Sequence, residues 1–178
     1  MNLPNKLTLA RIFLIPIFLF ITSLKVPYGE FLAAAVFIIA ASTDGLDGYF
    51  ARKNKMITRF GKIMDPLADK LLITAALISL VDLQKIPAWV AVVIIGREFA
   101  VSGLRTIAAA EGNVISASKL GKYKTISQII AIIAMFLSEK IVGVYLGQFL
   151  MAVAVVFTIW SGIDYYVKNW HIVKKDGI

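Results

Sequence analysis

The chain has 178 residues, of which 59% are hydrophobic, and its mean hydropathy is +0.80. Soluble domains are about 45–50% apolar, so this composition excludes an ordinary soluble protein and favours a polytopic membrane protein. The net charge of +8 does not indicate a nucleic-acid partner, because the basic residues gather at the ends of the apolar runs. Cysteine is absent, which excludes disulfide bonds.

Apolar runs separated by turn residues predict one all-α membrane domain over residues 1–178. The first run begins with a short amphipathic segment and has no small-residue cleavage site, so we expect it to remain as a helix. Six transmembrane helices are predicted, over residues 1–24, 30–53, 61–83, 87–110, 119–138 and 142–169. An even number of helices places both termini on the same side of the membrane.

The distribution of basic residues predicts which side that is. Only Lys25, Lys85 and Lys140 fall on the side opposite the termini. The terminal side carries Lys6, Arg11, the cluster from Arg52 to Lys62, Arg105, Lys119, Lys122, Lys124, Lys168, Lys174 and Lys175. By the positive-inside rule we expect both termini to be cytoplasmic and the protein to be a multi-pass protein of the cell membrane.

Near the amino terminus, Asn5, Thr8 and Arg11 recur at three-residue spacing and fall roughly on one helix face. Capping and anchoring at the membrane surface would explain them, and so would a role beside a bound nucleotide diphosphate. The residues themselves leave both interpretations open.

Four carboxylates stand out in the second and third predicted helices. Asp44 and Asp47 are three residues apart, and Asp65 and Asp69 are four apart, so each pair lies on one helix face. Facing helices would bring all four together, and such a cluster needs a compensating cation. Oxygen-only ligands suit Mg²⁺, Mn²⁺ or Ca²⁺. The alternative is a solvated acidic loop that pairs with neighbouring bases, namely Arg52, Lys53, Lys55, Arg59 and Lys62.

The fourth predicted helix carries charges in its interior. Arg97 lies about 15 Å along this helix at 1.5 Å per residue, near the middle of a bilayer, so it must face protein or a water-filled cavity. Glu98, Ser102 and Arg105 share one face. For Glu98 we favour a structural ion pair, and for Arg105 contact with a ligand. Metal-bound carboxylates beside such basic residues suit phosphoryl chemistry on a lipid, without identifying a nucleotide.

Aromatic residues at the end of the sixth predicted helix are typical of a membrane interface. They are Trp160, Tyr165, Tyr166 and Trp170. The one histidine, His171, follows them, and we expect it to be an exposed terminal residue rather than a ligand.

The aspartates belong to a longer pattern that runs from Asp44-x-x-Asp47-Gly48-x-x-Ala51-Arg52 to Gly61-x-x-x-Asp65-x-x-x-Asp69. This pattern resembles the signature of the CDP-alcohol phosphotransferase family at all eight of its fixed residues. The segments PNKLTLAR, GREFAVSGLR and GKYKT are similar to the phosphatidylglycerophosphate synthase branch. The resemblance implies transfer of a phosphatidyl group from CDP-diacylglycerol to sn-glycerol 3-phosphate, with release of CMP, in phosphatidylglycerol biosynthesis. It also implies a homodimer.

The resemblance also implies roles for individual residues. It makes Asp44, Asp47 and Asp65 ligands of Mg²⁺ or Mn²⁺, two ions in all, and makes Asp69 both the catalytic base and a further metal contact. The nucleotide and its diphosphate would meet Gly48, Ala51, Arg52 and Gly61, with Asn5 and Thr8 nearby.

The acceptor carries a phosphate and so needs a second basic site. Arg105, Lys122 and Lys124 are the candidates, with Arg97 behind them. A family member with another acceptor, such as inositol phosphate, is an alternative. A small cation transporter is a second alternative, from a different class of protein.

Overall fold

A computed structural model describes residues 3–24, 26–54, 59–110, 112, 115, 118–170 and 174. Within these ranges, the side chains of residues 3–5, 44–54, 59–60, 62–63 and 139–140 lie outside the description. Nothing in the described ranges is a β-strand, so the predicted all-α class is confirmed for that part of the chain.

The helices lie where the sequence predicts them, with every boundary within about two residues. The α-helices are α1 (Leu3–Ser23), α2 (Gly29–Asn54), α3 (Arg59–Asp82), α4 (Ala88–Ala110), α5 (Lys119–Phe136) and α6 (Val144–Lys168). A short π-helix, η1 (Ser138–Val142), joins α5 to α6. The amphipathic start of the chain is not a separate element, because α1 runs through it without a break from Leu3.

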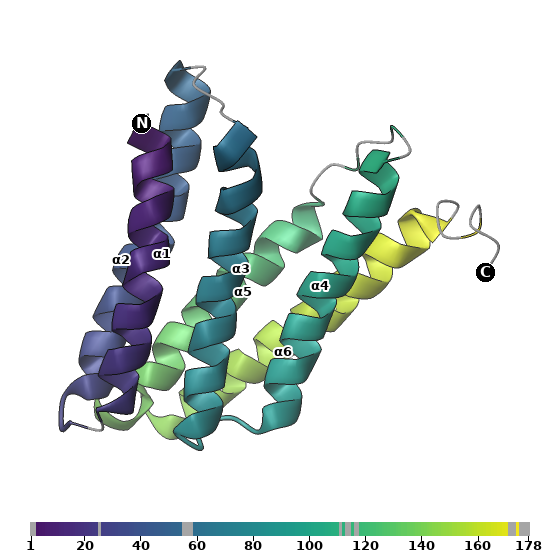
Figure 1. Cartoon of the computed structure of the whole chain (residues 1–178). Helices are drawn as coiled ribbons and strands as arrows, with labels where there is room; N and C mark the ends of the chain where they lie inside the picture. The colour runs from purple at the N-terminus through teal and green to yellow at the C-terminus, as the bar shows by residue number, and fades with distance from the viewer. Residues whose placement is uncertain are drawn as a thin grey trace.

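Consecutive helices run in opposite directions (Figure 1). The start of α1, the end of α2, the starts of α3 and α5, and the ends of α4 and α6 lie toward one end of the molecule. This end therefore carries residues 44–54 of α2 and residues 59–69 of α3, as well as the start of α5. Helix α1 packs against α2 and α3, and α6 packs against α4 and α5.

Turn residues end the helices at the opposite end of the bundle. Between α3 and α4, Gln84 adopts a positive φ of 57°, which is uncommon for a residue other than glycine. Before α6, the φ of Gly143 is 86°, a conformation that glycine adopts without steric cost. Pro66 lies inside α3 and beyond its first turn, because the helix already begins at Arg59.

The main core joins the first helices to the last. Phe18 of α1 packs its ring 6.2 Å from that of Phe37 in α2 and 5.6 Å from that of Phe136 in α5, measured between ring centroids. All three side chains are buried. Fully buried alanines on α3, Ala68 and Ala76, let that helix approach its neighbours closely.

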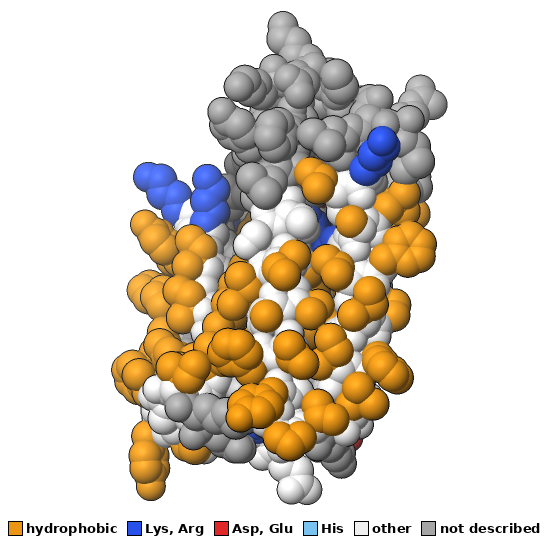
Figure 2. All heavy atoms as spheres, turned by 90° about the vertical axis from the view of Figure 1, so that its left-hand side faces the viewer, with side chains coloured by type: hydrophobic (Ala, Val, Ile, Leu, Met, Phe, Trp, Pro, Cys, Tyr) orange, Lys and Arg blue, Asp and Glu red, His pale blue; other side chains and the backbone are white. Residues whose placement is uncertain are grey.

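The outer surface is strongly apolar. Figure 2 shows hydrophobic side chains covering the middle and lower parts of one face, with lysine and arginine side chains nearer its upper edge. The exposed side chains include Phe13, Phe20, Trp89, Val92 and Phe99. By length and composition, two described helices can cross a membrane, Lys6–Ser23 and Val144–Lys168, and Gly29–Thr43 is a shorter apolar segment. Membrane crossing by all six helices stays a prediction.

Candidate functional site

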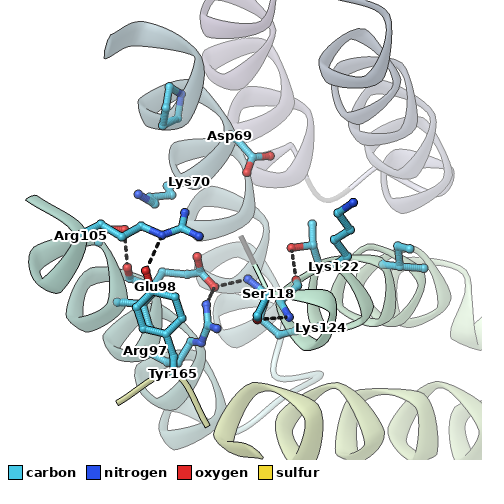
Figure 3. A pocket seen from close by; sticks show the side chains of 15 residues that line it. Asp69, Lys70, Arg97, Glu98, Arg105, Ser118, Lys122, Lys124 and Tyr165 are labelled. Carbon is cyan, nitrogen blue, oxygen red and sulfur yellow. Dashed lines mark hydrogen bonds and ion pairs between the residues drawn. The ribbon is translucent and has the colours of Figure 1, made fainter. Parts of the chain in front are cut away.

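A cavity of about 500 Å³ lies among α3, α4, α5 and α6. Figure 3 shows Asp69 of α3 on one side, with charged side chains of α4 and α5 around the same space. The charged residues in its lining are Asp69, Lys70, Arg97, Glu98, Arg105, Lys122 and Lys124. Five are cationic and two are acidic, so the lining carries a formal excess of three positive charges. Such a cavity suits an anionic ligand.

One face of α4 forms a wall of the cavity, as the spacing predicts. Glu98, Ser102 and Arg105 all line it, and Arg97 faces it as well. The side chain of Arg97 is 12% exposed, and its Nε has no hydrogen-bond partner among the described residues. The expectation that Arg97 faces protein or a cavity is thus consistent with its position.

Glu98 is the centre of a charged triad. Its Oε1 accepts hydrogen bonds from Lys124 Nζ of α5 and from Arg97 Nη1, the latter at 3.4 Å (Figure 3). The three side chains are at most 18% exposed. The favoured interpretation of Glu98 as a structural ion-pair partner fits this geometry. The carboxylate also fixes the position of Lys124, which we had expected to meet the ligand directly.

Arg105 is held in place by Tyr165, which we had expected to be an interfacial aromatic residue. Arg105 Nε donates a hydrogen bond of 2.8 Å to the hydroxyl of Tyr165, and its guanidinium carbon lies 5.4 Å from the centroid of the Tyr165 ring. Tyr165 is only 3% exposed and lines the cavity. Its assignment to an interfacial aromatic belt was therefore wrong, because the contact between α6 and α4 buries this ring. Trp160 and Trp170 are exposed, as expected.

The start of α5 brings two lysines to the cavity. Ser118 caps the helix by accepting a hydrogen bond of 3.0 Å from the backbone N–H of Gly121. Lys122 is exposed and Lys124 is 4% exposed, and both line the cavity. The predicted acceptor residues on α4 and α5 thus share one space, although they are up to 27 positions apart in the chain.

Two of the four aspartates have described side chains. Asp65 and Asp69 are both half-buried on α3, four residues apart, and Asp69 reaches the cavity. The Thr8 hydroxyl of α1, which is fully buried, donates a hydrogen bond to Asp65 Oδ1. Gly61 is buried at the start of the same helix. Thr8 therefore lies next to the aspartate motif, which supports a place near the site more than surface anchoring.

Arg11 is not a surface charge, although we had expected it to be one of the basic residues on the terminal side of the membrane. It is fully buried, and its Nε donates hydrogen bonds to the Ala40 carbonyl at 3.2 Å and to Thr43 Oγ1 at 3.3 Å. These contacts tie α1 to the part of α2 that directly precedes Asp44. Arg11 thus braces the motif and does not contribute a surface charge to the topology signal.

Several predicted residues cannot be placed as side chains. Asp44, Asp47, Gly48, Ala51 and Arg52 lie on the helical backbone of α2, and their side chains are outside the described residues. The side chain of Asn5 and the whole of His171 are outside it too. Among the side chains that are described, no three acidic or histidine residues gather as a metal site. The four-aspartate metal site therefore stays a prediction.

Lys70 lines the cavity and was missed. It follows Asp69 directly, so a helix turns it by about 100° from the aspartate face. The sequence held one signal, because a lysine that directly precedes the apolar run from Leu71 to Leu80 in a predicted membrane helix needs a polar space for its ammonium.

Comparison with known proteins assigns the chain to a family. The family model for CDP-alcohol phosphatidyltransferase matches residues 1–160. A protein of Bacillus subtilis named CDP-diacylglycerol–glycerol-3-phosphate 3-phosphatidyltransferase is 48% identical to this chain, with 97% of each covered. Proteins of the same name from Rickettsia felis and Pseudomonas fluorescens are 38% and 37% identical, covering 93% and 99% of this chain and 93% and 94% of their own lengths. The chain belongs to the CDP-alcohol phosphatidyltransferase family.

Proposed function

We propose that this protein transfers the phosphatidyl group of CDP-diacylglycerol to sn-glycerol 3-phosphate. A hydroxyl oxygen of the acceptor forms a new bond to the phosphorus that carries the diacylglycerol. The bond from that phosphorus to the CMP oxygen breaks, and CMP leaves with the electron pair. The names of the relatives support both substrates. The observation that carries the proposal is the cavity that joins Asp69 to a group of cationic side chains.

Asp69 is the proposed base. It lines the cavity that also holds the proposed acceptor site, so an acceptor hydroxyl can come within reach of its carboxylate. The proton of the attacking hydroxyl passes to this carboxylate as the new bond to phosphorus forms. A carboxylate near cations is a weak base, so position contributes more than basicity.

Divalent metal is part of the proposal. Asp65 and Asp69 present oxygen ligands one helical turn apart on α3, a donor type that suits Mg²⁺ or Mn²⁺. The hydrogen bond from Thr8 orients the Asp65 carboxylate, as partners of metal ligands commonly do. Asp44 and Asp47 would complete the set. Two bound ions would neutralise the diphosphate and the leaving phosphate.

The acceptor phosphate is proposed to bind Arg105, Lys122 and Lys124, with Arg97 behind them. Arg105 offers a planar fork that matches a phosphate, and Lys122 an exposed point charge. Lys124 already forms an ion pair with Glu98. Its ammonium would therefore have to divide its hydrogen bonds between that carboxylate and the acceptor phosphate. The nucleotide is proposed to bind apart from the acceptor phosphate, against α2 and the start of α3. The residues proposed to contact it are Gly48, Ala51, Arg52 and Gly61, with Asn5 close by.

The proposed setting is the cell membrane, with the cavity at the cytoplasmic end. The apolar outer surface supports a lipid environment, since soluble proteins rarely expose large apolar patches. The basic residues near the end of α2, the end of α4 and the start of α5 support the orientation. A homodimer is proposed from the family resemblance alone.

The decisive assay measures CMP release from CDP-diacylglycerol by purified protein with several acceptors. We expect release to depend on sn-glycerol 3-phosphate and to yield phosphatidylglycerophosphate. Release only with another acceptor, such as inositol phosphate, would assign the chain to a different branch. A chelator should stop turnover and added Mg²⁺ or Mn²⁺ should restore it, whereas full activity after verified metal removal would reject the metal site.

Substitutions separate the roles. Asp69→Asn should lower kcat by orders of magnitude with both substrates still bound. Arg105→Ala should raise the KM for sn-glycerol 3-phosphate about ten- to a hundredfold, the equivalent of one charge-assisted hydrogen bond, with little effect on the KM for the donor. A loss of donor binding instead would place the acceptor phosphate elsewhere.

The cavity argues against a small cation transporter. Its lining has five cationic side chains and two acidic ones, and this net positive charge would repel a transported cation. Transport of a cation with no CMP release from the lipid donor would nevertheless replace the proposal.

A further inference from the structure

Arg105 is an exposed arginine whose side chain is nevertheless oriented. It projects from α4 into the cavity, where its Nε donates to the Tyr165 hydroxyl at 2.8 Å (Figure 3). Its guanidinium carbon also lies 5.4 Å from the centroid of the Tyr165 ring, within the range of a cation–π contact. An exposed arginine without such contacts samples many rotamers, and ordering it on binding reduces affinity.

Tyr165 is well suited to hold it. The ring is 3% exposed and packs in a small core with Val101, Leu104 and Ala108 of α4. The hydroxyl therefore has a fixed position, because α6 packs against α4. Arg105 and Tyr165 are 60 positions apart in the sequence.

The geometry of the guanidinium gives this bond a consequence. Its five N–H donors point outward in one plane, and the Nε–H is on the edge beside the side-chain stem. When Tyr165 accepts from Nε, that edge is occupied, and the terminal nitrogens at the far end are left to form the bidentate fork. We propose that Tyr165 is a positioning residue for the acceptor site, which aims the terminal nitrogens of Arg105 at the acceptor phosphate.

This inference rests on the proposed function, because it needs the acceptor phosphate to bind at Arg105. It goes beyond it by assigning part of the affinity for the acceptor to α6, a helix that contributes none of the proposed catalytic, metal or phosphate-binding residues. It also predicts that the hydroxyl matters only through Arg105.

The test is a double-mutant cycle measured on the full-length purified enzyme. Tyr165→Phe removes the hydroxyl and keeps the ring and its packing. We expect the KM for sn-glycerol 3-phosphate to rise about three- to tenfold, the range for the cost of ordering one flexible side chain on binding, with kcat and the KM for CDP-diacylglycerol unchanged. In an Arg105→Ala background the same change should have no further effect.

The neighbouring residue provides a matched control. The Tyr166 hydroxyl donates to the Ala100 carbonyl at 3.0 Å, so it also links α6 to α4, but Tyr166 does not line the cavity. Tyr166→Phe should leave the KM for the acceptor unchanged.

Arg105→Lys provides a second background for the same test. It should also abolish the effect of Tyr165→Phe, because one ammonium cannot reproduce both the bond to the Tyr165 hydroxyl and the fork to the phosphate.

The outcomes are separable. If Arg105→Ala raises the KM for the acceptor but Tyr165→Phe leaves it unchanged, the positioning role is wrong and the acceptor site stands. Equal effects of Tyr165→Phe with and without Arg105, or an equal effect of Tyr166→Phe, would mean a general loosening of the α4–α6 contact and would overturn the inference. If Arg105→Ala itself has no effect in an enzyme that makes phosphatidylglycerophosphate, the proposed acceptor site fails first.

Discussion

Replacing Glu98 by glutamine tests the charged triad that Glu98 forms with Arg97 and Lys124 in the lining of the cavity. Glu98 Oε1 accepts from both Lys124 Nζ and Arg97 Nη1, and the lysine and arginine side chains are only 6% and 12% exposed. Glu98→Gln keeps the shape of the side chain but leaves two nearly buried cations without their shared counter-charge. The formal charge of the triad rises from +1 to +2.

The expected cost follows from this burial. Breaking a buried ion pair by removing one partner costs about 3–5 kcal/mol, and we expect the lower end because all three residues line a cavity. In a chain of this size, 1 kcal/mol corresponds to about 2–4 °C in Tm, so Glu98→Gln should lower Tm by at least about 6 °C.

Thermal unfolding followed by tryptophan fluorescence is a direct assay, since the chain has three tryptophans. The double variant Glu98→Gln/Lys124→Gln restores the triad charge to +1, so it should melt above Glu98→Gln alone. A Glu98→Gln protein that melts within about 1 °C of the wild type would refute the reasoning. So would a double variant whose destabilisation equals the sum of the two single effects.

Three further predictions concern packing, turn geometry and topology. Gly147→Ala should destabilise the protein by about 1–3 kcal/mol, because the new Cβ would lie 3.1 Å from a methionine sulfur on α5, whereas Gly96→Ala, with open space around it, should be tolerated in the same melting assay. Gln84→Gly should raise Tm by relieving a positive φ of 57°, a gain of up to about 1 kcal/mol, and an unchanged or lower Tm would contradict this. Cysteines at the exposed positions Asp82 and Lys119 should label from opposite sides of the membrane, and labelling from one side would break the six-helix topology.

The lysine in the turn between α3 and α4 shows why sequence position alone is a poor guide to such experiments. The sequence places Lys85 in an outward-facing turn, which would make it a natural labelling site. Its side chain is only 7% exposed and pairs with Glu30 of α2, with an Nζ to Oε2 distance of 2.6 Å. We therefore choose Asp82, which is exposed at the end of α3.

The sequence by itself determined where the helices lie and which residues of one helix share a face. Helix limits follow from the lengths of the apolar runs and from local turn residues, so they could be predicted to within about two residues. The position of Glu98, Ser102 and Arg105 along one wall of the cavity was predictable for a related reason, because 3.6-residue periodicity fixes which residues of one helix share a face.

Only the tertiary structure decided which partner each face meets. Tyr165 looked like an interfacial aromatic and Arg11 like a surface charge, yet both are buried by helices remote in sequence. The pairing of Glu98 with Lys124, across 26 positions, could not be read from either segment. The physical reason is that periodicity sets the direction of a side chain relative to its own helix axis, whereas burial and pairing depend on how the helices rotate and pack against each other.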